Sequence, residues 1–200
     1  MNVCTCTTLS RSRTYRLFAV AAGIVLLTAP AWSQQHYKID PAASEVQFTV
    51  GASDGAVKGT FHVSSGEFTL EPATGAMTGT VTVDAASGES GNKSRDKKMT
   101  NAQMKAQTYP AVTFAPSKFT GEVKDGGNST GQVEGSFTLI GQAHSITVPM
   151  NMHMEGGHFT ATGNFVVPYV SWGMKDPSWF VMKVDKEVNI QLKLAGTVTK

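Results

Sequence analysis

Apolar and polar residues alternate along most of the chain after residue 34, which is the pattern of β-strands that bury one face. The clearest runs are 46–50, 81–83 and 188–194, where every second residue is valine, isoleucine, leucine or phenylalanine. Turn signals such as Asp54-Gly55 and Gly156-Gly157 separate such runs. Short strands joined by tight turns predict an all-β fold, an antiparallel meander that closes into a barrel or packs as a sandwich.

One segment departs from this pattern. Residues 94–107, SRDKKMTNAQMKAQ, contain good helix formers with no proline or glycine, and Tyr109-Pro110 follows them. We expect one short helical segment here, placed as a lid or plug at one end of a barrel.

The first 33 residues have the organisation of a secretory signal. Three arginines precede an apolar run at 17–27, and small residues at 29, 31 and 33 follow it. The run is shorter than a membrane span needs, which disfavours an uncleaved anchor. We therefore predict a signal peptide at 1–33, a single domain at 34–200 and export to the periplasm. Cys4 and Cys6 would leave with the signal.

Charge limits the partners. Lysine and arginine total 17 and acidic residues total 15, and three of the basic residues lie in the signal, so 14 minus 15 leaves −1. This balance disfavours nucleic acid and anionic membrane surfaces as partners. The local basic cluster Lys93, Arg95, Lys97 and Lys98 is either a solvated face or an anion-recognition site.

One catalytic motif occurs literally. Residues 51–55, GASDG, match the G-x-S-x-G nucleophile elbow, which needs a strand before it and a helix after it. Here strand patterns lie on both sides, so a hairpin is the better interpretation, with an esterase using Ser53 kept as an alternative. We predict no enzyme, no catalytic residue, no cofactor and no metal site.

The stretch Met150-Asn151-Met152-His153-Met154 could suggest copper, because thioether sulfur selects Cu(I). In a strand, however, alternate side chains point to opposite faces, so the methionines continue an apolar stripe from Ile146 and His153 points outward. Methionine also fills irregular apolar space. A cavity wall is the main interpretation, and a periplasmic Cu(I)-handling protein is the alternative.

Several motifs in this order resemble the YceI-like lipid- or polyisoprenoid-binding proteins of bacterial periplasms. They are SGNKSRDKKM at 90–99, YPAVTF at 109–114, GSFTLIG at 135–141 and VPYVSWGMKDPS at 167–178. The resemblance spans the chain from Tyr37 to Gly196. This chain departs from the family at Ile140-Gly141-Gln142, and in having methionine at 150, 152 and 154.

The resemblance implies a lipocalin-like antiparallel barrel of about eight strands with a short helical segment, which holds a long apolar ligand. The implied ligand is an isoprenoid or a fatty-acid-type amphiphile, with transient contact to a membrane donor or acceptor. Two chains could pair through an edge strand, and a filled barrel acting only as an interaction module stays an alternative. Arg95, Lys97 and Lys98 are the expected head-group contacts. The expected cavity lining and mouth are Phe48, Phe61, Met99, Met104, Phe114, Phe137, Met150, Met152, Met154, Phe165, Trp172, Trp179 and Phe180.

Overall fold

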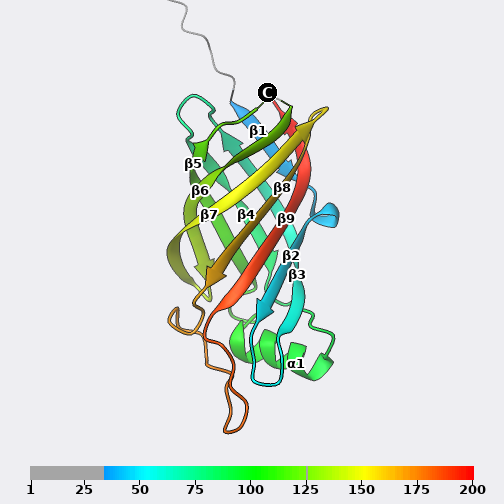
Figure 1. The fold of residues 1–200 in the computed structure, drawn as a ribbon, viewed down its shortest axis with the longest axis vertical. Helices are drawn as coiled ribbons and strands as arrows, with labels where there is room; N and C mark the ends of the chain where they lie inside the picture. The colour runs from blue at the N-terminus through cyan, green and yellow to red at the C-terminus, as the bar shows by residue number, and fades with distance from the viewer. Residues whose placement is uncertain (1–33, 125) are drawn as a thin grey trace, which may run out of the picture. The chain divides into compact units, whose positions relative to one another are not determined.

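The computed structural model describes residues 34–124 and 126–200 (Figure 1). The predicted signal peptide lies outside these residues. The described part forms nine strands in one sheet whose hydrogen-bonded neighbours are all antiparallel. In chain order they are β1 (Gln35–Ile39), β2 (Glu45–Val50), β3 (Val57–Leu70), β4 (Met77–Asp84), β5 (Ala111–Gly121), β6 (Gly127–Leu139), β7 (Gln142–Glu155), β8 (His158–Val167) and β9 (Val188–Thr199).

The sheet closes because β1 and β2 share one place in the wall. Both strands pair with β3 on one side and with β9 on the other. A single 3-10 turn, η1 (Pro41–Ala43), separates them, and Asp40 caps it by accepting a hydrogen bond from the Ala42 N–H at 3.0 Å. Nine strands therefore fill eight positions, and the predicted eight-stranded antiparallel barrel is confirmed.

The helical segment is also confirmed, but it is shorter than expected. Helix α1 (Lys93–Lys98) continues into a π-helical turn, η2 (Met99–Gln103). It ends before residue 107 because Lys105 adopts a left-handed backbone with φ of 50°. Among the described residues, no helix combines the length and apolar character needed to span a membrane.

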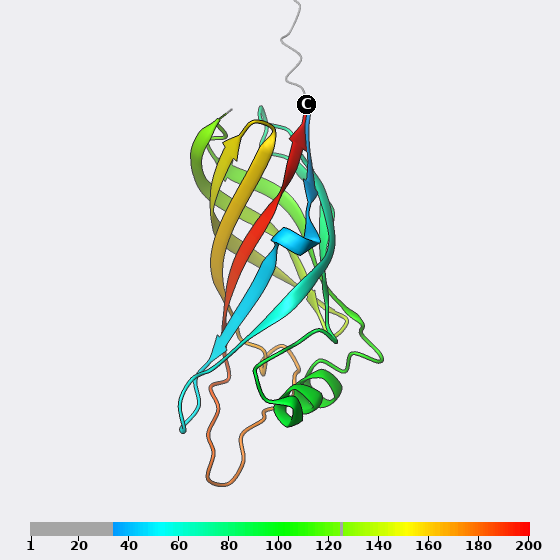
Figure 2. The same cartoon turned by 90° about the vertical axis from the view of Figure 1, so that its right-hand side faces the viewer.

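The two ends of the barrel differ. The start of β1, the end of β9 and the turns after β3, β5 and β7 lie at one end, called the terminal end below (Figures 1 and 2). The other end, called the helical end, carries α1, η2, the β2–β3 connection, the β6–β7 turn and the long β8–β9 loop, residues 168–187.

The β6–β7 turn is a two-residue hairpin turn. Ile140 and Gly141 both have positive φ, 45° and 77°, as a type I′ turn requires. A β-branched residue is strained in this region of backbone space. The Ile140 side chain is only 6% exposed, so burial at the helical end offsets the strain.

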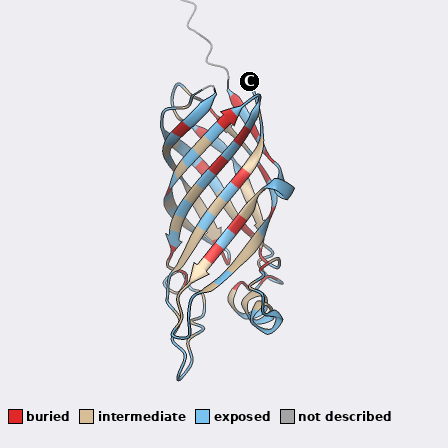
Figure 3. Ribbon diagram, turned by 45° about the vertical axis from the view of Figure 1, so that its right-hand side comes forward, coloured by how far each residue is buried: buried red, intermediate tan, exposed pale blue. Residues whose placement is uncertain are grey.

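Burial alternates along the strands as the sequence pattern predicts (Figure 3). In β7, every residue on the parity of Met150 from His144 to Met154 is partly or fully buried, and every residue on the parity of His153 is exposed. Buried side chains form two clusters. Tyr37 and Phe159 belong to the first, and Met104 and Tyr169 belong to the second, together with residues of the helical end.

Inward glycines let large side chains lie flat against the wall. Phe48 is paired with Gly59, and a Cβ added to Gly59 would lie 2.5 Å from the Phe48 ring. Met150 covers Gly163 in the same way, with its sulfur 2.4 Å from an added Cβ. Such pairs set how far each bulky side chain extends into the barrel.

Candidate ligand-binding interior

The middle of the inner wall is apolar and incompletely buried. Phe61, Val83 and Ile190 pack against both buried clusters, so they lie between them, and each keeps some accessible surface. The same intermediate exposure recurs at inward positions on neighbouring strands. These positions are Val81, Phe114, Val133, Phe137, Ile146, Met150, Met152, Phe165 and Leu192.

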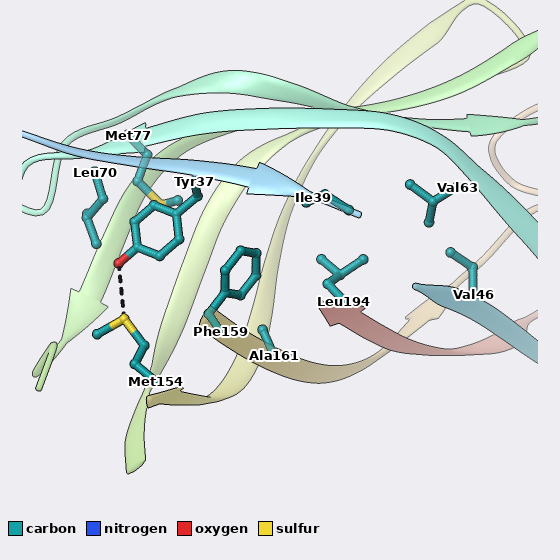
Figure 4. Close-up of a cluster of buried hydrophobic side chains, with 10 residues drawn as sticks. All are labelled: Tyr37, Ile39, Val46, Val63, Leu70, Met77, Met154, Phe159, Ala161 and Leu194. Carbon is teal, nitrogen blue, oxygen red and sulfur yellow. Dashed lines mark hydrogen bonds between the residues drawn. The ribbon is translucent and has the colours of Figure 1, made fainter. Parts of the chain in front are cut away.

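The terminal end is sealed by aromatic rings (Figure 4). Tyr37 stacks on Phe68 with ring centroids 4.7 Å apart, and Phe159 meets Tyr37 edge-on at 5.3 Å. Tyr37 and Phe159 are 1% and 2% exposed. The Tyr37 hydroxyl lies 2.7 Å from Gln35 Oε1 and 3.7 Å from Met154 Sδ, so the methionine nearest this end belongs to the seal.

A second aromatic group lies at the helical end. Phe137 contacts both Phe165 and Trp172 with ring centroids 5.9 Å apart. His144, on the inward parity of β7, stacks on Trp172 at 4.0 Å with an interplanar angle of 3°. Among the described residues, His144 Nε2 and Gln103 Oε1 are the buried side-chain polar atoms without a hydrogen-bond partner. The helical end therefore combines aromatic surface with unused hydrogen-bonding capacity.

The helical segment covers this end through its methionines. Met104 is 7% exposed and belongs to the buried cluster of the helical end. Met99 reaches Gly88, where an added Cβ would lie 2.5 Å from the Met99 methyl carbon and 2.7 Å from the Phe61 ring. Both methionines thus pack against the helical end of the barrel.

The basic residues of α1 divide into one that is engaged and others that are exposed. The Arg95 side chain donates to the Ser90 hydroxyl at 2.7 Å and to the Ser90 carbonyl at 2.8 Å. Asp96 accepts from the Ser90 backbone N–H at 2.9 Å and from the Ser90 hydroxyl. Residues 90–96, SGNKSRD, therefore form a hydrogen-bonded group, called the latch below, that fixes the start of α1 to the preceding loop. Lys97 and Lys98 are exposed.

Trp179 and Phe180 do not join the inward residues. They are 79% and 92% exposed and lie in the β8–β9 loop. The loop instead places Trp172 and Tyr169 against the helical end. Of the three aromatic residues of this loop that we expected at the mouth, the structure brings Trp172 to it.

The methionines of β7 line the wall in sequence. Met150 and Met154 are four residues apart, which separates their Cα atoms by about 13 Å in a strand. Met154 contacts Tyr37, Met150 covers Gly163, and His153 points outward to Asn128 Oδ1 at 2.8 Å. The stretch does not converge on one point, as a shared metal ion would need.

Ser53 lies in a strand–turn–strand connection, as its context predicts. Its hydroxyl accepts a hydrogen bond from the Lys183 N–H at 3.2 Å, and its own N–H donates to the Lys183 carbonyl at 2.9 Å. The serine thus fastens the β8–β9 loop to the β2–β3 connection. The element directly after it is strand β3, whereas a nucleophile elbow leads into a helix.

Two ionisable groups of this loop are perturbed. Burial raises the pKa of the Tyr169 hydroxyl to about 12, and the carboxylates of Asp176 and Asp185 add to the effect. That hydroxyl donates to the Asp185 carbonyl oxygen at 2.5 Å. Hydrogen bonds from Ser178 hold the pKa of Asp176 below its usual value. Both groups fasten the loop.

The surface of the described residues has shallow hollows, of which two have a defined lining. One, of about 540 Å³, crosses β5, β6 and β7, and its lining consists mostly of outward strand residues. The other, of about 280 Å³, lies at the terminal end beside the β3–β4 turn. Neither contains the aromatic groups described above.

Sequence reasoning missed four interior residues, namely Tyr37, Phe68, Phe159 and His144. Period two would have placed each on an inward face, since Tyr37 alternates with exposed His36 and Lys38. The seal itself joins β1, β3 and β8, and no local pattern indicates that they meet.

Comparison with known proteins agrees with this architecture. The model of the YceI-like domain family matches residues 37–195. A UPF0312 protein of Vibrio cholerae is 33% identical over 137 residues, covering 66% of this chain and 70% of that protein.

Solved structures share the fold. BcnA of Burkholderia cenocepacia is 24% identical with a TM-score of 0.65, covering 80% of this chain and 99% of that one. A polyisoprenoid binding domain from Saccharophagus degradans is 14% identical with a TM-score of 0.64, covering 82% and 98%. The family model matches most of the chain, and the closed barrel is the fold of these structures. The chain therefore belongs to the YceI-like family.

Proposed function

We propose that this protein binds a long apolar or amphiphilic molecule, of the polyisoprenoid or fatty-acid type, inside the barrel and acts as a carrier rather than an enzyme. The observation that supports this proposal is the incomplete burial of the inward side chains between the two clusters, including Phe61, Met152 and Ile190. Because alternate side chains of a strand point to opposite faces, we infer that the remaining surface of these inward side chains faces the interior. A polyisoprenoid binding domain among the structures of this fold supports the ligand class.

The ligand would enter from the helical end. The terminal end is closed by Tyr37, Phe68 and Phe159 at stacking distance. The helical end is covered by the α1–η2 segment, the β6–β7 turn and the β8–β9 loop, which are connections rather than wall. A chain buried there gains about 0.8 kcal/mol per methylene, so a long tail supplies most of the binding energy.

A polar head would lie at the helical end. His144 Nε2 and Gln103 Oε1 offer hydrogen-bonding capacity there. Lys97 and Lys98 are exposed on α1 at the same end, whereas Arg95 is held by Ser90. This arrangement favours an uncharged or weakly acidic head near the aromatic group, with the lysines at the rim.

We also propose that the mature protein starts near Gln34 and works in the periplasm. The arginine, apolar and small-residue order of residues 11–33 supports this proposal. Osmotic-shock fractionation and the intact mass of the released protein test it. A cytoplasmic protein that keeps its first 33 residues would contradict it.

The binding proposal is tested by filling the interior. Met152→Trp adds bulk at a partly buried inward position of β7, whereas Asn151→Trp adds the same ring on the exposed face of that strand. Each protein is purified from the organism that makes it, extracted with organic solvent and analysed by mass spectrometry. We expect wild type and Asn151→Trp to carry a lipid near one per protein, and Met152→Trp to carry much less.

Circular dichroism and the thermal midpoint show whether each variant still folds. If folded wild type repeatedly carries no lipid, or if folded Met152→Trp carries as much as wild type, the interior is not the binding site.

A further inference from the structure

The tip of the β8–β9 loop, residues 179–182, presents four apolar side chains to solvent. Trp179, Phe180, Val181 and Met182 are 79%, 92%, 82% and 42% exposed. Among the described residues, the other large hydrophobic side chain in this exposed class is Val166, at 50%. A single exposed apolar side chain is ordinary, but a contiguous group marks an interaction site.

The tip is a formed turn. The Trp179 N–H donates to the Met182 carbonyl at 2.8 Å, and the Met182 N–H donates to the Trp179 carbonyl at 3.0 Å. These two bonds close a hairpin with Phe180 and Val181 at its end.

The residues on either side of the tip, Ser178 and 183–185, form a stem that is hydrogen-bonded to the barrel. The Ala52 and Val184 backbones form a bridge, and the Asp185 N–H donates to the Gly51 carbonyl at 2.8 Å. The Ser178 hydroxyl accepts from the Val184 N–H at 3.0 Å across the stem. The β8–β9 loop, residues 168–187, is called the arm below. Its fastened stem holds the apolar tip out beyond the helical end (Figures 1 and 2).

The helical end also carries a surplus of basic residues, which comes from α1. The arm balances Lys175, Lys183 and Lys186 with Asp176, Asp185 and Glu187, whereas α1, whose sequence is KSRDKK, lies at the same end with four basic residues and one acidic residue (Figure 2). The one acidic residue of α1, Asp96, is engaged with Ser90. The net charge of the predicted mature chain hides this polarity, because acidic residues such as Glu67, Glu71 and Glu122 lie toward the other end.

We propose that residues 179–182 insert into the head-group region of an anionic phospholipid bilayer, with the lysines of the arm and α1 facing its surface. A folded protein partner or a second copy needs a face of roughly 800 Å² per partner, whereas four side chains on a turn form a narrow projection. A bilayer accepts such a projection, and tryptophan favours its interfacial region. Basic residues add attraction to anionic lipid, which salt screens.

The test uses residues 34–200, which contain all nine strands and both buried clusters. Flotation is measured with phosphatidylcholine vesicles, with and without phosphatidylglycerol. We expect binding that phosphatidylglycerol strengthens and salt weakens. Replacing both rings, Trp179→Ser with Phe180→Ser, should lower the partition coefficient by about tenfold or more. Val166→Ser removes an exposed apolar side chain from the barrel wall and should leave binding unchanged.

Tryptophan fluorescence provides a second measurement, which reports on the environment of the tip itself. Trp172→Phe leaves Trp179 as the only tryptophan of residues 34–200. We expect its emission to shift to the blue on vesicle addition and to be quenched by brominated lipid.

Two results would overturn the proposal. One is equal vesicle binding by wild type and the Trp179→Ser, Phe180→Ser variant. The other is a concentration-dependent dimer that this variant abolishes without any vesicle binding, which would make the tip a contact between copies. Met152→Trp should bind vesicles like wild type, so a failure of interior binding is separable from a failure of docking.

Discussion

At the residue scale, two inward glycines look equivalent in sequence but differ in what surrounds them. A Cβ on Gly196 would lie 2.0 Å from the Lys38 backbone oxygen, so β1 and β9 would have to separate. A Cβ on Gly163 would meet Met150 Sδ at 2.4 Å, which is the end of a flexible side chain. The rigidity of the neighbour, rather than the space alone, decides the outcome.

We therefore predict that Gly196→Ala lowers the free energy of unfolding by about 1–3 kcal/mol, the usual cost of overpacking. Gly163→Ala should cost less, because Met150 can move and alanine restricts the unfolded chain. Urea denaturation of both variants checks this, with Thr197→Ala on the exposed face of β9 as the control. Equal losses for the two glycine variants would contradict the argument.

Tyr169 gives a prediction about pH. Its pKa is raised to about 12 from an ordinary 10, so the folded protein holds this proton more tightly than the unfolded chain does. The stability that this provides is complete below pH 10 and is lost as the pH rises through about 12. The thermal midpoint of wild type should exceed that of Tyr169→Phe at neutral pH, because the hydroxyl donates to the Asp185 carbonyl.

That difference in midpoint should shrink between pH 10 and pH 12. A difference that stays constant over this range would show that the tyrosine proton is not linked to folding.

At the scale of elements, the start of α1 depends on a latch rather than on helix length. Six residues of α-helix are too few to be stable alone. Asn92 caps the helix by accepting from the Ser94 and Arg95 N–H groups at 3.0 and 3.1 Å, and Arg95 holds Ser90. The cover over the helical end is thus fastened by a few polar contacts, as a lid that opens requires.

We predict that Arg95→Gln weakens this cover without unfolding the barrel. Loss of its two bonds to Ser90 should cost about 1 kcal/mol of local stability. Amide hydrogen exchange should become faster in residues 93–103 and stay unchanged in β7. Lys97→Gln, which changes an exposed lysine of the same helix, is the matched control, and equal exchange in the two variants would contradict the latch.

Local patterns predicted the elements well, and tertiary contacts explain what they missed. Alternation correctly placed Met150 and His153 on opposite faces, because strand geometry alone decides this. The helix was expected to continue past Lys105, whose left-handed backbone has no glycine to signal it. Apolar character suggested a mouth position for Trp179, but the bond from Lys183 to Ser53, 130 residues away, holds the arm outward.

At the scale of the whole molecule, the candidate site is a property of closure. Phe61, Met152 and Ile190 come from β3, β7 and β9, and they pack against the same buried cluster only because the sheet returns on itself. Alternation in the sequence can predict that each of these residues faces inward. Whether the barrel is filled or hollow depends on which side chains meet across its interior. The barrel is therefore asymmetric, because aromatic side chains close its terminal end and loops cover its helical end. The apolar arm lies at the helical end.

The shared place of β1 and β2 sets the order of assembly. Ile39 pairs with Gly196 and His36 pairs with Thr199, so the wall joins nearly the first described residues to nearly the last. During synthesis, the adjacent hairpins from β4 to β8 can form early, but the circle stays open until β9 has left the ribosome. A contact of such sequence separation is slow to form. The barrel therefore closes only after β9 has been synthesised, and until then the nascent sheet keeps two unpaired edges.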